Sequence, residues 1–196
     1  EMPIDKINKP DALKSLNLDP NFKYILFFGQ IKKVKKLDVL LKAMVDVDSS
    51  TRLIVAGKVW KDDFLTYQQI IDENKLSNKL ILDIQFISDH KRELYFKCAD
   101  LMVLPYQEIY QSGVLLMSMS YGIPTLVSDI PPFKEIISDK LNGFFFLNNN
   151  EKDLSQKINA IISNEDQLKL VSIKGIDTMK SHHNWTKIAK SYLEFI

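Results

Sequence analysis

The sequence is short of cysteine, of net charge and of long apolar runs, and each shortage excludes a class of protein. Cys98 is the single cysteine among 196 residues, which excludes a disulfide framework and a multi-cysteine metal site. The formal charge is +1, from 26 basic and 25 acidic residues, so we expect no nucleic-acid partner. No apolar run approaches the roughly 18 residues of a membrane span. We therefore expect a cytoplasmic protein.

Several motifs that mark familiar chemistries are also missing. The chain has neither the G-x-x-x-x-G-K-[ST] phosphate loop nor the G-x-G-x-x-G dinucleotide fingerprint, which disfavours P-loop and NAD chemistry. No G-x-S-x-G or H-E-x-x-H motif occurs. The three histidines, His90, His182 and His183, lack the spacing of metal ligands. We expect neither a cofactor nor a metal.

What the sequence does contain is a regular alternation of short apolar runs and amphipathic segments. Apolar runs predict strands over residues 23–28, 52–57, 79–86, 101–104, 124–128 and 144–147. Helical spacing predicts helices over 11–18, 37–45, 62–75, 90–98, 113–121, 132–138, 151–163 and 185–195. Such alternation with short loops predicts an α/β fold, a Rossmann-like parallel six-stranded sheet with helices on both faces. We expect residues 1–11 to be a tail or linker and residues 12–196 to be one domain.

The loop after the first predicted strand, residues 29–36, is strongly basic. Four lysines stand just ahead of a predicted helix: Lys32, Lys33, Lys35 and Lys36. Positive side chains and the free N–H groups of a helix N-terminus both favour an anion, most simply a phosphate. A solvated basic loop without a ligand is the alternative.

The loop after the fourth predicted strand offers a second anion-binding element. Ser112 is a suitable N-cap for the next helix, and Gly113 lets a ligand approach the backbone closely. Successive N–H groups of Ser112, Gly113 and Val114 could cradle phosphate or sugar oxygens. Glu108 is the only carboxylate in this loop. An ordinary capped helix beside a surface carboxylate is the alternative.

In their order and spacing these segments resemble the C-terminal domain of GT-B fold glycosyltransferases, in the large group of retaining enzymes called group 1 or family 4. The resemblance runs from about residue 12 to the end and is carried by residues 27–31, 35–41, 53–57, 99–106, 111–114, 120–124 and 135–137. The Gln-Ser-Gly-Val sequence at 111–114 is similar to one subgroup. The resemblance implies one half of a GT-B fold, with the N-terminal domain absent; the start at Glu1 instead of methionine fits an excised domain.

The resemblance also implies residue roles. Lys35 falls on the family's phosphate-binding lysine, Lys32 on an alternative basic position, and Gln30 where an arginine is usual. The implied donor-diphosphate residues are Gly29, Gln30, Lys32, Lys35, Ser112, Gly113 and Val114.

At some further positions the residue differs from the one usual in the family, and at others it matches. Ile109 and Met117 stand where the family has paired glutamates, so recognition of the donor sugar and ribose would shift to Glu108 and Gln111. Phe86 and Ile87 match the nucleobase-side loop. Lys36 replaces a glycine, and residues 130–132 replace a glycine-rich turn. The resemblance assigns no catalytic residue and no metal to this chain.

By resemblance, the full-length enzyme transfers a sugar from a UDP- or GDP-linked donor to a glycan or lipid acceptor, with retention. The missing N-terminal domain would hold the acceptor, so the chain alone would be inactive, and the full-length protein could attach peripherally to a membrane. The predicted helix over 185–195 carries an apolar face that could form a dimer. A different GT-B enzyme, such as an epimerase, would need catalytic carboxylates and a histidine in these loops. A non-catalytic partner subunit with a degenerate site is the remaining alternative.

Overall fold

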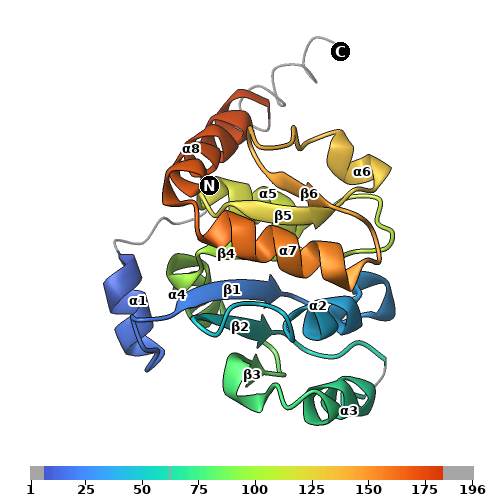
Figure 1. Cartoon of the computed structure of the whole chain (residues 1–196). Helices are drawn as coiled ribbons and strands as arrows, with labels where there is room; N and C mark the ends of the chain where they lie inside the picture. Colours follow the sequence, from blue (N-terminus) through green and yellow to red (C-terminus); the bar gives the residue numbers. More distant parts are fainter. Residues whose placement is uncertain (1–6, 62, 183–196) are drawn as a thin grey trace.

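The chain forms one six-stranded sheet in which every pair of neighbouring strands is parallel (Figure 1). The structure is a computed structural model that describes residues 7–61 and 63–182. The strands are β1 (Lys23–Phe28), β2 (Thr51–Ala56), β3 (Leu80–Asp83), β4 (Leu101–Leu104), β5 (Thr125–Ser128) and β6 (Phe144–Phe146). Their order in the sheet is β3-β2-β1-β4-β5-β6. The order therefore reverses between β1 and β4, which is where sheets of this kind hold their ligands.

Helices cover both faces of the sheet, as the sequence predicts (Figure 1). α2 packs between α3 and α7, whereas α4 packs against α1, and α5 packs against α8. The predicted helix over 185–195, and any dimer contact through it, lies outside the described residues. The helices are α1 (Lys9–Ser15), α2 (Leu37–Ala43), α3 (Leu65–Glu73), α4 (Asp89–Cys98), α5 (Gly113–Ser120), α6 (Pro131–Lys134), α7 (Glu151–Ile162) and α8 (Glu165–His182), with short 3-10 turns η1 (Lys33–Lys35) and η2 (Ser77–Lys79).

The central strands are buried on both faces because their residues are mostly apolar. All four residues of β4 are fully buried, and β4 pairs with β1 through Ile25↔Leu101 and Leu26↔Met102. Burial on both faces is typical of strands in a covered parallel sheet. Asp100, directly before β4, accepts hydrogen bonds from the Tyr24 N–H (2.8 Å) and from the Lys9 ammonium, so it ties α1 to the sheet.

The prediction for the third strand is wrong at its end. β3 stops at Asp83, three residues before Phe86, and the Phe86 side chain is 82% exposed. The Asp83 carboxylate accepts hydrogen bonds from Gln85 Nε2 (2.7 Å), Tyr95 Oη (2.8 Å) and Lys91 Nζ (2.8 Å). Because this edge strand has one neighbour and its last side chain bonds to the loop and α4, the chain leaves the sheet there.

The Asp83 carboxylate should make a pH-dependent contribution to stability. Burial alone would raise its pKa, but the hydrogen bonds from Lys91, Gln85 and Tyr95 outweigh burial and hold the pKa below its usual value. A lowered folded-state pKa stabilises the fold above the unfolded pKa of about 3.9, and that contribution is lost as the pH falls. We expect Asp83→Asn to lower the free energy of unfolding by about 1–3 kcal/mol at pH 7. Urea unfolding at pH 7 and pH 3 tests this: a difference between the variant and the original chain that is equally large at both pH values would contradict it.

Candidate functional site: a crevice between the loops after β1 and β4

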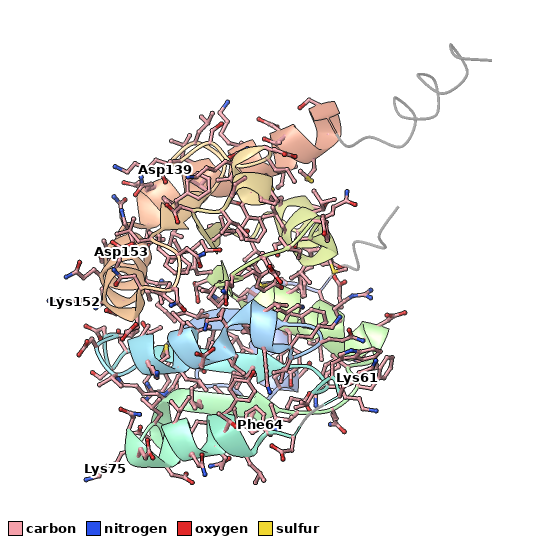
Figure 2. The ribbon with its side chains drawn as sticks, turned by 90° about the vertical axis from the view of Figure 1, so that its right-hand side faces the viewer. Lys61, Phe64, Lys75, Asp139, Lys152 and Asp153 are labelled. Atoms are coloured by element: carbon pink, nitrogen blue, oxygen red, sulfur yellow. The ribbon has the colours of Figure 1, made fainter. Side chains whose placement is uncertain are left out.

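The candidate site lies at the carboxyl ends of β1 and β4, where the strand order reverses. Figure 2 shows the molecule from the side toward which the strand arrows of Figure 1 point. The two loops are joined by a backbone hydrogen bond from Gln107 N–H to Val34 C=O (2.8 Å). Neighbouring loops that diverge from a switch point leave a crevice between them. Gly29, Lys35 and Val114 lie together at this point, and we refer to the place where the two loops meet as the crevice.

Lys35 connects the two sides of the crevice. Its Nζ lies 5.0 Å from the ring centroid of Tyr106, in the loop after β4. A Cβ placed on Gly29 would lie 3.3 Å from the same Nζ and 3.6 Å from Val114 Cγ2. The ammonium of Lys35 therefore lies beside the end of β1 and over the Tyr106 ring, and Val114 in the first turn of α5 is also next to Gly29. The structure thus brings together three of the predicted diphosphate residues, Gly29, Lys35 and Val114.

The backbone directly after Lys35 adopts a conformation that favours glycine. Lys36 adopts φ +51°, in the left-handed region, and forms the N-cap of α2. A glycine takes this conformation without the steric penalty of a Cβ. The Lys36 ammonium lies 3.5 Å from Asp38 Oδ2 and so points along α2. The left-handed residue turns the chain from η1 into α2.

The pKa of the Lys35 ammonium is lower than that of a solvated lysine. Burial, with repulsion from Lys32 as a second cause, lowers the pKa of Lys35 to about 8. No carboxylate among the described residues forms an ion pair with it. A half-buried ammonium without a counter-ion gains more from an anion than a solvated lysine does, because the surrounding dielectric is lower. The position is therefore suited to a phosphate.

The N-terminus of α5 supplies backbone donors beside Lys35. Ser112 is the N-cap, and its buried Oγ accepts a hydrogen bond from Leu115 N–H (3.2 Å), which confirms the capping role. The N–H groups of Gly113 and Val114 have no acceptor within the part of the chain that the structure describes. A Cβ on Gly113 would meet nothing within 4 Å, so the space beside the Gly113 Cα is open. Helix N-terminal donors and the Lys35 ammonium on one edge of the sheet are groups that favour an anion.

The open space at Gly113 leads to a testable expectation. Gly113→Ala should leave stability unchanged or raise it by about 0.4–1 kcal/mol, since the new methyl group meets no atom and the unfolded chain loses freedom. The same methyl group would lie next to the α5 donors, so if a diphosphate binds there its affinity should fall by about tenfold, as for one lost charge-assisted hydrogen bond. Thermal unfolding and calorimetric titration with UDP and GDP measure the two effects. Unchanged affinity would show that no ligand atom lies close to Gly113.

The other predicted site residues lie farther out on the surface. Gln30, Glu108 and Gln111 are exposed, and their proposed contacts with a donor stay predictions. Lys32 Nζ lies 5.1 Å from the ring centroid of Trp60, so it faces the loop after β2.

The nucleobase-side residues differ from one another in burial. Phe86 is exposed, as described above, and Ile87 is half-buried. Ser88 follows as the N-cap of α4, and its side chain accepts a hydrogen bond from Lys91 N–H. The loop therefore ends at a defined helix start, while its role with a nucleobase stays a prediction.

Three features of the site were not predicted. Tyr106 and Gly57 lie within the segments that carry the family resemblance, but no role was attached to either. A Cβ on Gly57 would lie 2.0 Å from the Gly29 carbonyl oxygen, so the ends of β1 and β2 touch through two glycines. Trp60 and Lys61 follow the second strand, and a tryptophan between lysines in such a loop is the signal that could have pointed to them.

Two further properties were searched for in the described residues. Within 7–61 and 63–182, no three His, Cys, Asp or Glu side chains come together as a candidate metal site. None of the helices in these ranges combines the length and apolarity needed to cross a membrane. Cys98 is fully buried and its thiol donates to the Tyr95 carbonyl; burial raises its pKa to about 12, as expected of a core thiol.

The chain is similar in sequence to glycosyltransferases. It is 28% identical over 167 residues to an uncharacterized glycosyltransferase, MJ1178, of Methanocaldococcus jannaschii, with 85% of this chain and 46% of the relative covered. It is 23% identical over 175 residues to the lipopolysaccharide core biosynthesis mannosyltransferase LpsB of Rhizobium meliloti, with 86% and 50% covered. The chain therefore spans about half the length of the curated relatives it matches.

Solved structures show the same fold. HepE of Anabaena, solved with UDP, superposes with a TM-score of 0.90 at 16% identity, covering 100% of this chain and 54% of HepE. The C-terminal domain of the group 1 glycosyl transferase LpcC of Francisella tularensis superposes with a TM-score of 0.79 at 16% identity, covering 91% and 94%. These likenesses confirm the Rossmann-like half of a GT-B fold. The family model described as "Glycosyl transferases group 1" matches residues 8–190, and the chain belongs to that family.

Proposed function

We propose that this chain is the donor-binding half of a retaining glycosyltransferase, which transfers a sugar from a nucleotide-diphosphate sugar to a glycan or lipid acceptor. The observation that carries the proposal is the Lys35 ammonium, which lies over the Tyr106 ring and beside Gly29, with Val114 of α5 also next to Gly29. A diphosphate in the crevice would pair with this ammonium and accept hydrogen bonds from Gly113 and Val114. Solved relatives of the same fold carry UDP or UDP-glucose.

The same groups would stabilise the reaction as it proceeds. When the bond between the sugar and the diphosphate breaks, negative charge accumulates on the departing phosphate. Fixed donors aimed at that position lower the barrier because they are already oriented. Lys35 and the N–H groups of Gly113 and Val114 would supply this stabilisation without a metal. The departing phosphate, held in this way, would help to remove the proton of the acceptor hydroxyl.

The outer residues would recognise the rest of the donor. Gln30 and Lys32 would extend the diphosphate contacts, and Glu108 and Gln111 would bind the ribose and the donor sugar. The backbone around Phe86 and Ile87 would contact the nucleobase. One curated relative from Xanthomonas oryzae is named for GDP-mannose, whereas the HepE complexes hold UDP compounds, so UDP and GDP are both candidates.

The acceptor would be bound by a second domain. Orienting two substrates in a closed cleft supplies much of the rate of such reactions. The chain by itself would therefore bind a donor weakly and transfer no sugar. In the full-length protein we propose a cytoplasmic location with peripheral attachment to the membrane where the acceptor is a lipid.

Calorimetric titration with UDP-sugars and GDP-sugars tests the proposed function. We expect one nucleotide class to bind and the other to bind at least about tenfold more weakly. The alternative is a non-catalytic partner subunit with a degenerate site, for which Gln30 and Met117 are the supporting residues. Absence of binding by either class would favour that alternative and contradict the proposal.

A further inference from the structure

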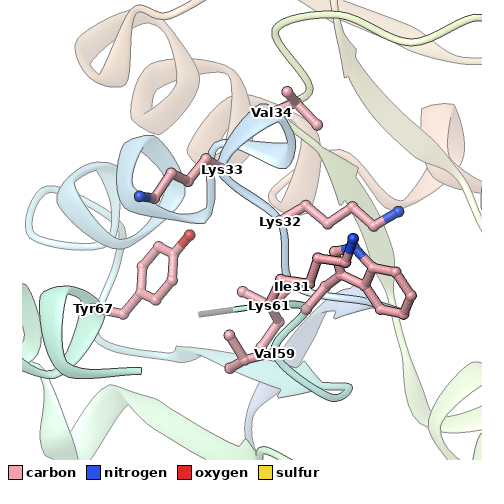
Figure 3. A pocket seen from close by; sticks show the side chains of 8 residues that line it. Ile31, Lys32, Lys33, Val34, Val59, Lys61 and Tyr67 are labelled. Atoms are coloured by element: carbon pink, nitrogen blue, oxygen red, sulfur yellow. The ribbon is translucent and has the colours of Figure 1, made fainter. Parts of the chain in front are cut away.

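A pocket lies between the η1 turn and the loop after β2. This β2-loop pocket has a volume of about 280 Å³ and is lined by Lys32, Lys33, Trp60, Lys61, Tyr67 and Val59, among others. Figure 3 shows Lys33 and Tyr67 on one side of it, Lys32 and Lys61 on the other, and Val59 below. A backbone bridge between Ile31 and Val59 holds its two walls together, with hydrogen bonds from Ile31 N–H to Lys58 C=O (2.9 Å) and from Trp60 N–H to Ile31 C=O (3.0 Å).

The lining of this pocket combines positive charge with an aromatic surface. Lys32 Nζ and Lys61 Nζ lie 5.1 Å and 5.6 Å from the ring centroid of Trp60. Three lysines line the pocket, and none of the described lining residues is acidic. The Trp60 side chain is 47% exposed, so part of its ring is open to a ligand. Lysines attract an anion, while the flat apolar ring can pack against the C–H face of a small ring.

We propose that the β2-loop pocket binds a phosphorylated sugar, separately from the nucleotide diphosphate in the crevice. The phosphate would pair with Lys61, and the sugar ring would lie on Trp60. If the proposed function holds, this ligand is the phosphorylated end of the acceptor, and that identification rests on the proposed function. The existence of the site does not rest on it.

The volume of the pocket favours a monosaccharide phosphate over a whole nucleotide sugar. Ligand pockets commonly span about 300–1,000 Å³, so a pocket of about 280 Å³ is at the small end. Lys35, which would hold the donor diphosphate, lies over Tyr106 and is not among the lining residues. Two anionic groups could therefore bind at the same edge of the sheet on different lysines and different aromatic rings.

Tryptophan fluorescence during titration with glucose 1-phosphate tests the proposal. The chain has two tryptophans, and Trp60→Phe identifies the part of the signal that comes from position 60. We expect glucose 1-phosphate to change that signal even when UDP or GDP is present at saturation. Inorganic phosphate and methyl glucoside should each bind more weakly than the combined ligand. Lys61→Ala should raise the Kd for glucose 1-phosphate at least about fivefold, as for a weakened charge-assisted contact.

Lys58→Ala is the matched control, because Lys58 is an exposed lysine of the same loop that does not line the pocket. Equal weakening by Lys58→Ala and Lys61→Ala would overturn the proposal, since it would indicate unspecific attraction. Displacement of glucose 1-phosphate by UDP or GDP would overturn it too, by assigning the pocket to the donor. Lys61-dependent binding to phosphatidylglycerol vesicles that exceeds binding of glucose 1-phosphate would point to a membrane surface instead. If neither nucleotide binds, the proposed function fails, and the same titration without nucleotide still tests the pocket.

Discussion

Lys35→Ala is expected to weaken the binding of UDP or GDP by about 10- to 150-fold. The side chain places a positive charge beside Gly29, which also neighbours Val114 of α5. Loss of a hydrogen bond to a charged group contributes about 1.5–3 kcal/mol, and about 1.4 kcal/mol is tenfold in affinity. Calorimetric titration of both chains measures the ratio. Lys152→Ala is the matched control: Lys152 is an exposed lysine of α7, at the position labelled in Figure 2. Equal affinity of the Lys35→Ala variant and the original chain would contradict the role of Lys35.

The pH dependence of binding gives an independent test of Lys35. Its pKa of about 8 means that the ammonium loses its proton as the pH rises through that value. Affinity for UDP or GDP should therefore fall between about pH 7.5 and 9.5, by at most tenfold per pH unit. In Lys35→Ala that fall should disappear. A fall of the same size in the variant would assign the titration to another group.

The stability of the Lys35→Ala variant should change in the opposite direction to its affinity. The folded pKa of Lys35 is about 8, below the unfolded value of about 10.4, so the unfolded chain binds the proton more tightly. The free energy of unfolding therefore increases as the pH rises from about 8 to about 10.4. At pH 7 the half-buried, charged ammonium destabilises the fold. We expect Lys35→Ala to be at least as stable as the original chain at pH 7. Urea unfolding measures this. A variant that is as stable as the original chain would show that its lower affinity does not result from unfolding.

Gly57→Ala is expected to destabilise the fold by on the order of 3 kcal/mol, through overpacking and backbone strain. The new Cβ would lie 2.0 Å from the Gly29 carbonyl oxygen and 2.7 Å from the carbonyl carbon, so backbone must move. The φ of Gly57 is +154°, which also disfavours a side chain. For a chain of this size the melting temperature should fall by about 6–12 °C. Because Gly29 would be displaced, nucleotide affinity should fall as well.

Gly113→Ala is the control for the Gly57 experiment, since it makes the same chemical change beside the same crevice. A Cβ on Gly113 meets nothing within 4 Å, so that variant should keep its melting temperature. Thermal unfolding followed by circular dichroism compares the three chains. A melting temperature of Gly57→Ala within about 2 °C of that of the original chain would lie below the shift expected for 1 kcal/mol. That result would show that the close contact between the two glycines does not affect stability.

Most of the fold could be predicted from the sequence because its strands are short, apolar and bounded by glycine, proline or polar residues. β4 was predicted with its observed bounds, since Asp100 precedes it and Pro105 follows it. The end of β3 could not be predicted, because Ile84 and Phe86 continue the apolar pattern. Only the tertiary hydrogen bonds of Asp83 to Tyr95 and Lys91 show that the chain leaves the sheet there.

The site could be predicted by residue type but not by geometry. The lysines of residues 32–36 are evident in the sequence, yet the sequence does not show that Lys35 lies over Tyr106 while Lys32 lies over Trp60. Those placements depend on the turn at η1 and on the left-handed Lys36. The contact between Gly29 and Gly57 depends on the register of β1 with β2, which pairs Phe28 with Ala56. Contacts between distant segments are set by the sheet, and local patterns do not encode them.

Mapping where a nucleotide binds is the most direct test of the central claim, that the crevice between the β1 and β4 loops holds the donor diphosphate. Nuclear magnetic resonance of the labelled 22.7 kDa chain, titrated with UDP and with GDP, reports the amide of each residue. The account predicts that the largest amide shifts occur at Gly29, Gly113 and Val114, and that Lys35→Ala suppresses them. Shifts absent from these three amides, with binding elsewhere on the chain or none at all, would contradict it.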